Sequence, residues 1–171
     1  MNLYLIRHGD AEKISRDVQD FNRKLTPEGE SILKDAVKNW KTLIPSLDYI
    51  ISSPYIRAIK TAKIIASEYG ILDKFVANDK LSCGSKTDDI LEIVNSLDGK
   101  NIALVGHEPD FSNHLSKFIS STVAFASFKK GAIAKIIFNN KAALSRGVLE
   151  FLIPAEIFYK KNRVNGYTSS Y

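Results

Sequence analysis

Residues 3–12 of the chain read Leu-Tyr-Leu-Ile-Arg-His-Gly-Asp-Ala-Glu, and this stretch decides the fold class. Its first four residues are apolar, with aromatic and β-branched members, and Arg-His-Gly ends the run. A short apolar run of this kind predicts a buried β-strand, here over residues 2–6, that enters a loop. The polar side chains of Arg7 and His8 therefore follow the first predicted strand directly.

Further apolar runs predict the rest of the sheet. Strands are expected at residues 49–52, 101–105, 132–138 and 148–153, with weaker candidates at 75–77 and 125–128. The runs at 132–138 and 148–153 are joined by Asn139-Asn140 and nearby residues, and this pattern predicts a hairpin on one edge of the sheet.

Helices are expected between these strands. Thr26 and Pro27 are typical of a helix start, because threonine caps the first N–H groups and proline is tolerated at the first helical position. Apolar residues, Trp40 among them, then recur at helical spacing as far as Ile44. Further helices are expected at residues 55–69 (ending at Gly70), from 87 or 88 to about 97, and after Pro109. This alternation favours an α/β fold, a three-layer α/β/α sandwich around a mainly parallel sheet.

Length and composition fit one soluble domain. The chain has 171 residues, 44% hydrophobic and 25% charged, and no apolar run approaches the ~18 residues of a membrane span. We expect a domain over residues 1–155 and a loosely docked or mobile tail over 156–171. The start has no basic segment before its apolar run, so we expect a cytoplasmic protein without a membrane partner.

Net charge is +5, which makes an anionic partner plausible. The basic residues are spread along the sequence, so a solvated surface is favoured over a nucleic-acid patch, and no nucleic-acid partner is expected. Cys83 is the single cysteine, which excludes an intramolecular disulfide and a zinc site built on several cysteines. We expect it to be a small buried or half-buried residue, with no base or charge close by.

Three predicted strand ends carry similar polar groups. Residues 7–10 read Arg-His-Gly-Asp, residues 52–57 read Ser-Ser-Pro-Tyr-Ile-Arg, and residues 106–109 read Gly-His-Glu-Pro. In an open α/β sheet, ligands bind at the carboxyl ends of the strands, so these segments are expected to converge. Two histidines and two arginines would then face one cleft.

This set of side chains suits a phosphoryl group. Guanidinium is permanently charged and matches phosphate oxygens bidentately, and Arg57 would lie in the first turn of its helix, where an anion is favoured. The surrounding positive charge should lower the pKa of His8 and keep it neutral and nucleophilic. Gly9 would allow close backbone approach or a positive φ. A lone histidine after a strand is more often structural, so the hypothesis depends on the three segments together.

The same segments resemble the motifs of a known family, the histidine phosphatase superfamily, which includes phosphoglycerate mutases. The resemblance lies in residues 3–12, 52–62 and 104–109, in that order. Asp10-Ala11, Leu25-Thr26 with Gly29, and residues 81–84 (Leu-Ser-Cys-Gly) are most similar to its SixA branch of phosphohistidine phosphatases.

The resemblance implies a phosphoglycerate mutase-like fold and a phosphatase with a covalent phosphohistidine intermediate. His8 would accept the phosphoryl group, and Arg7, Arg57 and His107 would complete the phosphate pocket, with Gly9 against the substrate. His107 would donate a hydrogen bond to the transferring group. No metal and no cofactor are implied, because the arginines supply the positive charge.

One departure from the family bears on the substrate. Relatives that cleave alcohol esters place a glutamate as proton donor where this chain has residues 81–85, Leu-Ser-Cys-Gly-Ser. An alkoxide needs a proton to leave, whereas an imidazole protonated on its other nitrogen leaves neutral. We therefore expect phosphohistidine on a protein to be the preferred substrate. Asp10, Glu12 or Glu108 could still donate a proton, although each also fits a solvated or helix-capping carboxylate.

Two alternatives stay open at this point. One is a small-molecule phosphomonoesterase of the same superfamily, with a small phosphorylated substrate in place of a phosphorylated protein. The other is a non-catalytic module that binds phosphate or a polyanion.

Overall fold

The computed structural model describes residues 1–16 and 18–159. Its centre is a six-stranded sheet in the order β3-β2-β4-β1-β5-β6. The strands are β1 (Asn2–Arg7), β2 (Tyr49–Ser52), β3 (Phe75–Ala77), β4 (Asn101–Gly106), β5 (Ile133–Ile137) and β6 (Val148–Ile153). Strands β1 to β4 are parallel to one another, and β5 and β6 form the expected antiparallel hairpin on one edge.

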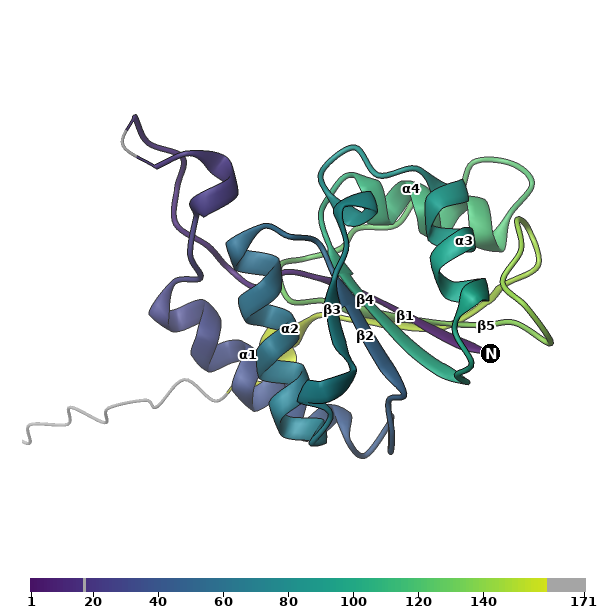
Figure 1. Cartoon of the computed structure of the whole chain (residues 1–171), viewed down its shortest axis with the longest axis horizontal. Coiled ribbons are helices and arrows are strands. Elements are labelled where there is room, and N and C mark those ends of the chain that lie inside the picture. The colour runs from purple at the N-terminus through teal and green to yellow at the C-terminus, as the bar shows by residue number, and fades with distance from the viewer. Residues whose placement is uncertain (17, 160–171) are drawn as a thin grey trace, which may run out of the picture.

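Helices cover both faces of the sheet, as predicted (Figure 1). Helices α1 (Pro27–Trp40) and α2 (Ile56–Tyr69) lie on one face, and α3 (Thr87–Ser96) and α4 (Asp110–Ile119) lie on the other. Short 3-10 helices are η1 (Asp20–Asn22), η2 (Leu72–Lys74), η3 (Asp79–Leu81) and η4 (Ala155–Phe158). None of the helices in the described part of the chain has the length and apolarity needed to cross a membrane.

The alternation of side chains along the central strands explains the two covered faces. Leu3 and Leu5 of β1 pack into the core under α3 and α4, whereas Tyr4 and Ile6 pack into the core under α1 and α2. Strand β4 divides its side chains between the same two cores. Because both faces of these strands are buried, their sequences read as continuous apolar runs.

Local sequence signals account for the ends of α1 and α2. The Oγ1 of Thr26 accepts a hydrogen bond from the Gly29 N–H at 3.0 Å, which is the expected cap of α1. Helix α1 ends at Trp40 and a turn over residues 41–43 follows, before Ile44, which precedes Pro45 and is therefore disfavoured in helical conformation. Gly70 ends α2 with a φ of 69°, as expected.

The weak strand prediction at residues 125–128 is wrong. The segment has no strand structure, and its carbonyls at Phe128 and Ala126 accept hydrogen bonds from the side chains of Arg7 and Ser112 at 2.6 and 3.0 Å. Phe125 is 96% exposed, whereas Phe128 is buried in the core. Of the predicted tail, residues 156–158 belong to η4, which lies against α1, and residues 160–171 lie outside the described residues.

Candidate active site

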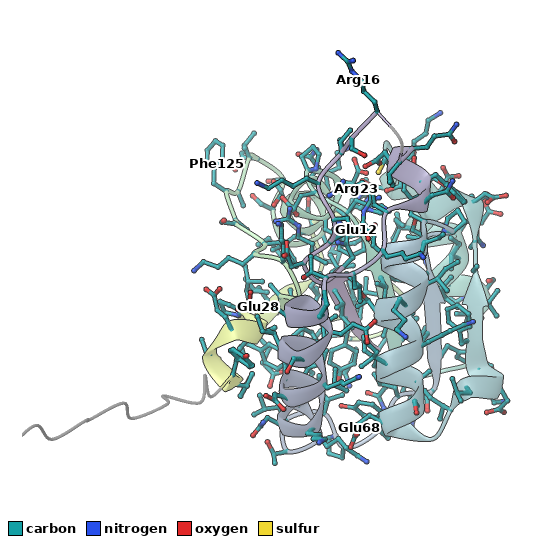
Figure 2. The ribbon with its side chains drawn as sticks, turned by 90° about the vertical axis from the view of Figure 1, so that its left-hand side faces the viewer. Glu12, Arg16, Arg23, Glu28, Glu68 and Phe125 are labelled. Carbon is teal, nitrogen blue, oxygen red and sulfur yellow. The ribbon has the colours of Figure 1, made fainter. Side chains whose placement is uncertain are left out.

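The carboxyl ends of β1, β2 and β4 bring three of the four predicted pocket side chains into contact. The chain beyond β1 stays beside β4, because the His8 N–H donates to the Gly106 carbonyl at 3.1 Å. The Ser53 N–H donates to the Val105 carbonyl at 2.9 Å in the same way. Figure 2 shows this end of the molecule at the top, near Glu12 and Arg23, with Glu68 at the opposite end.

His8 is buried, with 7% of its surface exposed. Its Nδ1 lies 2.7 Å from the Gly9 carbonyl oxygen. A carbonyl only accepts hydrogen bonds, so Nδ1 carries the proton and the lone pair is on Nε2. That lone pair accepts a hydrogen bond from Nε of Arg57 at 3.1 Å. The tautomer is therefore the one in which Nε2 is the nucleophilic atom.

The pKa of His8 is lowered from 6.5 to about 3. Burial is the main cause, and the hydrogen bond to the Gly9 carbonyl opposes it. The charges of His107, Arg57 and Arg7 lower the pKa further. The direction agrees with the expectation from sequence, but desolvation contributes more than the neighbouring positive charge.

Gly9 allows close packing and does not adopt a special backbone conformation. Its φ is not positive, but a Cβ at this position would overlap with Cδ1 of Leu33 on α1. The Gly9 N–H also donates to Oγ1 of Thr61 on α2 at 3.1 Å. The absent side chain thus lets the loop after β1 pack closely against α1 and α2.

Arg57 lies in the first turn of α2 and is 3% exposed. Besides its contact with His8, its Nη2 lies 3.4 Å from Nδ1 of His107. The ring of Tyr55 packs on the guanidinium, with the carbon Cζ 4.7 Å from the ring centroid. One permanently charged group therefore links both histidines.

His107 follows β4 and is 2% exposed. Its Nδ1 faces a guanidinium, which only donates, so the proton is on Nε2 and is donated to Oγ of Ser53 at 2.7 Å. The ring centroids of His8 and His107 are 5.2 Å apart. Burial lowers the pKa of His107 to about 4, and the charge of Arg57 is the next cause. Both histidines are therefore neutral at neutral pH.

Arg7 is the pocket residue that does not join this hydrogen-bonded group. Its Nη1 donates to the Phe128 carbonyl at 2.6 Å, and its buried Nε has no partner among the described residues. Burial lowers the pKa of Arg7, and the nearby charge of Glu108 opposes this effect. Arg7 still acts on the site through its charge, which lowers the pKa of both His8 and His107.

The three candidate proton donors have other partners. Asp10 accepts a hydrogen bond from the Thr26 hydroxyl at 3.2 Å and pairs with Lys130. Oε2 of Glu12 accepts a hydrogen bond from the Lys24 N–H at 3.0 Å. Glu108 accepts hydrogen bonds from the N–H and the Oγ of Ser112, at 3.1 and 2.7 Å. Among the described contacts, none joins these carboxylates to either histidine. Glu108 thus behaves as a cap for the first turn of α4.

Sequence reasoning missed Asp20 and was wrong about Cys83. The backbone oxygen and the carboxylate of Asp20 both accept from Arg57, at 2.6 and 3.1 Å. Asp20 lies in a segment without helical or strand periodicity, and only its spacing from Arg23, with which it pairs, could have drawn attention to it.

Cys83 is exposed, not buried as expected, and its Sγ lies 3.8 Å from Nη2 of Arg57, so a charged group is close to it.

The positive charge in this site comes from arginine side chains. Within residues 1–16 and 18–159, no group of three or more His, Cys, Asp or Glu side chains is arranged to hold a metal ion. Two neutral histidines and two guanidiniums form a site that can attract a phosphoryl group and offer it a nucleophilic nitrogen.

Comparison with known proteins agrees with this chemistry. The model of the histidine phosphatase superfamily (branch 1) matches residues 3–81. An uncharacterized protein of Picosynechococcus sp. is 31% identical over 115 residues, which are 64% of this chain and 68% of that relative. The chain belongs to the histidine phosphatase superfamily. This membership confirms the predicted enzyme class, a phosphatase of the hydrolase type.

Solved structures confirm the predicted fold of this histidine phosphatase. The protein histidine phosphatase SixA in complex with tungstate has a TM-score of 0.79 at 16% identity, covering 93% of this chain and 100% of that one. A mutant phosphoserine phosphatase from Entamoeba histolytica in complex with phosphoserine has a TM-score of 0.69 at 17% identity, covering 91% and 98%. The three-layer, phosphoglycerate mutase-like architecture is therefore shared with enzymes whose named substrates differ.

Proposed function

We propose that this histidine phosphatase hydrolyses phosphohistidine on a protein and that His8 takes the phosphoryl group as a covalent intermediate. The observation that carries the proposal is the state of His8, a buried and neutral imidazole whose Nε2 lone pair lies 3.1 Å from the Arg57 guanidinium. A neutral imidazole nitrogen beside a fixed cation is suited to attack phosphorus. The cytoplasmic location expected from the sequence belongs to the same proposal.

The proposed reaction has two in-line transfers. In the first, Nε2 of His8 forms a bond to phosphorus while the bond to the substrate nitrogen breaks, and the imidazole leaves as a neutral group when its other nitrogen is protonated. In the second, water attacks phosphorus, the bond to Nε2 breaks, and the proton of the water leaves with inorganic phosphate. Arg57 and Arg7 would stabilise the charge on the phosphoryl oxygens. His107, whose Nε2 proton is donated to Ser53, would donate to those oxygens in its other tautomer, with the proton on Nδ1 and Nε2 accepting from the Ser53 hydroxyl.

The choice of substrate rests on the engaged carboxylates. Asp10, Glu12 and Glu108 each have a partner away from the histidines, so the site offers a leaving alkoxide no ready proton. A neutral imidazole needs none. The fold shared with a protein histidine phosphatase named SixA, whose structure holds the oxyanion tungstate, supports the same substrate class.

The test is to trap the intermediate with labelled substrate. Wild-type protein quenched during turnover should carry label that is labile in acid and stable in base, and His8→Ala should carry none. His114→Gln is a matched control, because His114 is equally buried but hydrogen-bonded to Ser85 and Thr87 outside the site. Label that survives acid, or that remains on His8→Ala, would exclude the mechanism.

A substrate panel tests the specificity. It contains a phosphohistidine peptide, a phosphoserine peptide, p-nitrophenyl phosphate and sugar phosphates, compared by kcat/KM. The phosphohistidine peptide and the aryl phosphate should be hydrolysed far faster than the alkyl phosphates. Equal rates for alkyl phosphates would assign the protein to the phosphomonoesterases.

A further inference from the structure

The outer face of the Arg57 guanidinium is already occupied by an anionic side chain. Nη1 donates to the backbone oxygen of Asp20 at 2.6 Å, and Nη2 donates to its Oδ2 at 3.1 Å. Arg57 is almost fully buried, whereas the Asp20 side chain is 40% exposed. A phosphoryl group that approaches these N–H groups therefore meets a carboxylate in the same place.

Several contacts fix Asp20 over the arginine. Its Oδ1 accepts from Nη1 of Arg23 at 2.7 Å. The neighbouring ring of Phe21 packs on Tyr55, with the centroids 4.9 Å apart, and Tyr55 packs on the Arg57 guanidinium. Partial burial alone would raise the pKa of Asp20, but the hydrogen bonds and charges of Arg23 and Arg57 outweigh burial and lower it. The carboxylate is therefore charged at neutral pH.

We propose that Asp20 lowers the affinity of the site for phosphate and so promotes the release of inorganic phosphate after each turnover. The inference rests on the proposed function, which places the phosphoryl group against Arg57. Two buried or half-buried guanidiniums, one of them in the first turn of α2, would bind the dianionic product tightly without a nearby carboxylate.

Asp20 can weaken that binding without disturbing the arginine. Its carboxylate neutralises part of the charge of Arg57 and repels the phosphate dianion. Its backbone oxygen, which every substitution at this position retains, still holds Nη1 in place. A charge effect and a positioning effect are thus separable by mutating only the side chain.

The experiment is calorimetric titration of the full-length protein with inorganic phosphate at low salt. Asp20→Asn keeps the shape of the side chain and removes its charge, and we expect it to bind phosphate about 3- to 30-fold more tightly than wild type. The gain should shrink at high salt, because the carboxylate is partly exposed. Asp73→Asn, an exposed aspartate on η2 beside Lys74, is the control and should bind like wild type.

Asp20→Glu keeps the charge and should bind phosphate no more than about threefold differently from wild type. In turnover, Asp20→Asn should show a lower inhibition constant for phosphate and for vanadate and no rise in kcat. Phosphate binding by Asp20→Asn that is equal to or weaker than wild type, or undetectable in both, would overturn the inference, and so would equal tightening by Asp20→Glu. Calorimetry needs no turnover, so a missing phosphoenzyme on His8 would refute the proposed function and leave this result intact.

Discussion

The stability of the fold should depend on pH through three buried histidines. The pKa of His8 is lowered from 6.5 to about 3, and the pKa values of His107 and His114 are each lowered to about 4, chiefly by burial. Between these values and 6.5, the unfolded chain binds more protons than the folded chain. Stability is therefore fully present above pH 6.5 and is lost as the pH falls toward 4.

The magnitude follows from the pKa shifts. At pH 5 each histidine should remove about 2 kcal/mol from the free energy of unfolding, relative to pH 7, and the three together about 6 kcal/mol. Whole domains are stable by roughly 5–15 kcal/mol, so the effect is large enough to measure easily. Asp10 and Asp20 contribute little in this range, because their pKa values are lowered and they titrate below it.

Urea unfolding at pH 7 and pH 5 measures the effect, with His114→Gln as the diagnostic variant. His114 makes hydrogen bonds at 2.8 Å with Ser85 and at 2.9 Å with Thr87. The glutamine amide offers these hydroxyls a donor and an acceptor but cannot take up a proton. The difference in unfolding free energy between the two pH values should therefore be about 2 kcal/mol smaller in the variant. An equal difference in both proteins would refute the reasoning, since the buried histidine would then not be a source of the pH dependence.

Three further predictions concern catalysis. Activity should survive excess EDTA, and vanadate should inhibit competitively; loss of activity with EDTA and recovery with a divalent ion would contradict the arginine-based site. The single variants Asp10→Asn, Glu12→Gln and Glu108→Gln should each lose less than about tenfold in kcat/KM on phosphohistidine, and a loss of about 10²-fold or more would identify a general acid. Ser53→Ala removes the acceptor of the His107 N–H, so the His107 ring loses its fixed orientation. The variant should lower kcat/KM on p-nitrophenyl phosphate about 5- to 30-fold. An unchanged kcat/KM would mean that Ser53 does not orient His107.

The sheet and its helices could be predicted because their signals are local or periodic. The apolar runs of β1 and β4 are continuous, since both faces of these strands are buried, and the start of α1 at Thr26-Pro27 is determined by its own cap. The segment 125–128 has the same kind of apolar sequence but forms no strand. Its carbonyls bind the side chains of Arg7 and Ser112 instead of a neighbouring strand, and such partners are a property of the assembled fold.

The residues that follow strands could also be predicted as candidate site residues, because parallel strands bring their carboxyl ends to one edge. The sequence placed His8, Arg57 and His107 together, and they are in contact. It could not place Asp20, whose segment reaches Arg57 through loop geometry that has no periodic signal. For the same reason it could not show that Cys83 lies beside a guanidinium.

The contacts around His8 also determine what must happen first in the proposed reaction. Nε2 cannot attack phosphorus while it accepts the hydrogen bond from Nε of Arg57, because one lone pair cannot serve both. The incoming phosphoryl oxygens offer the guanidinium a stronger, charged acceptor. When the Arg57 N–H donates its hydrogen bond to a phosphoryl oxygen instead of to His8, the lone pair on Nε2 becomes free to attack as the phosphoryl group binds. The same arginine would then orient the nucleophile and bind the substrate, and the low pKa of His8 would keep its Nε2 lone pair available for the attack.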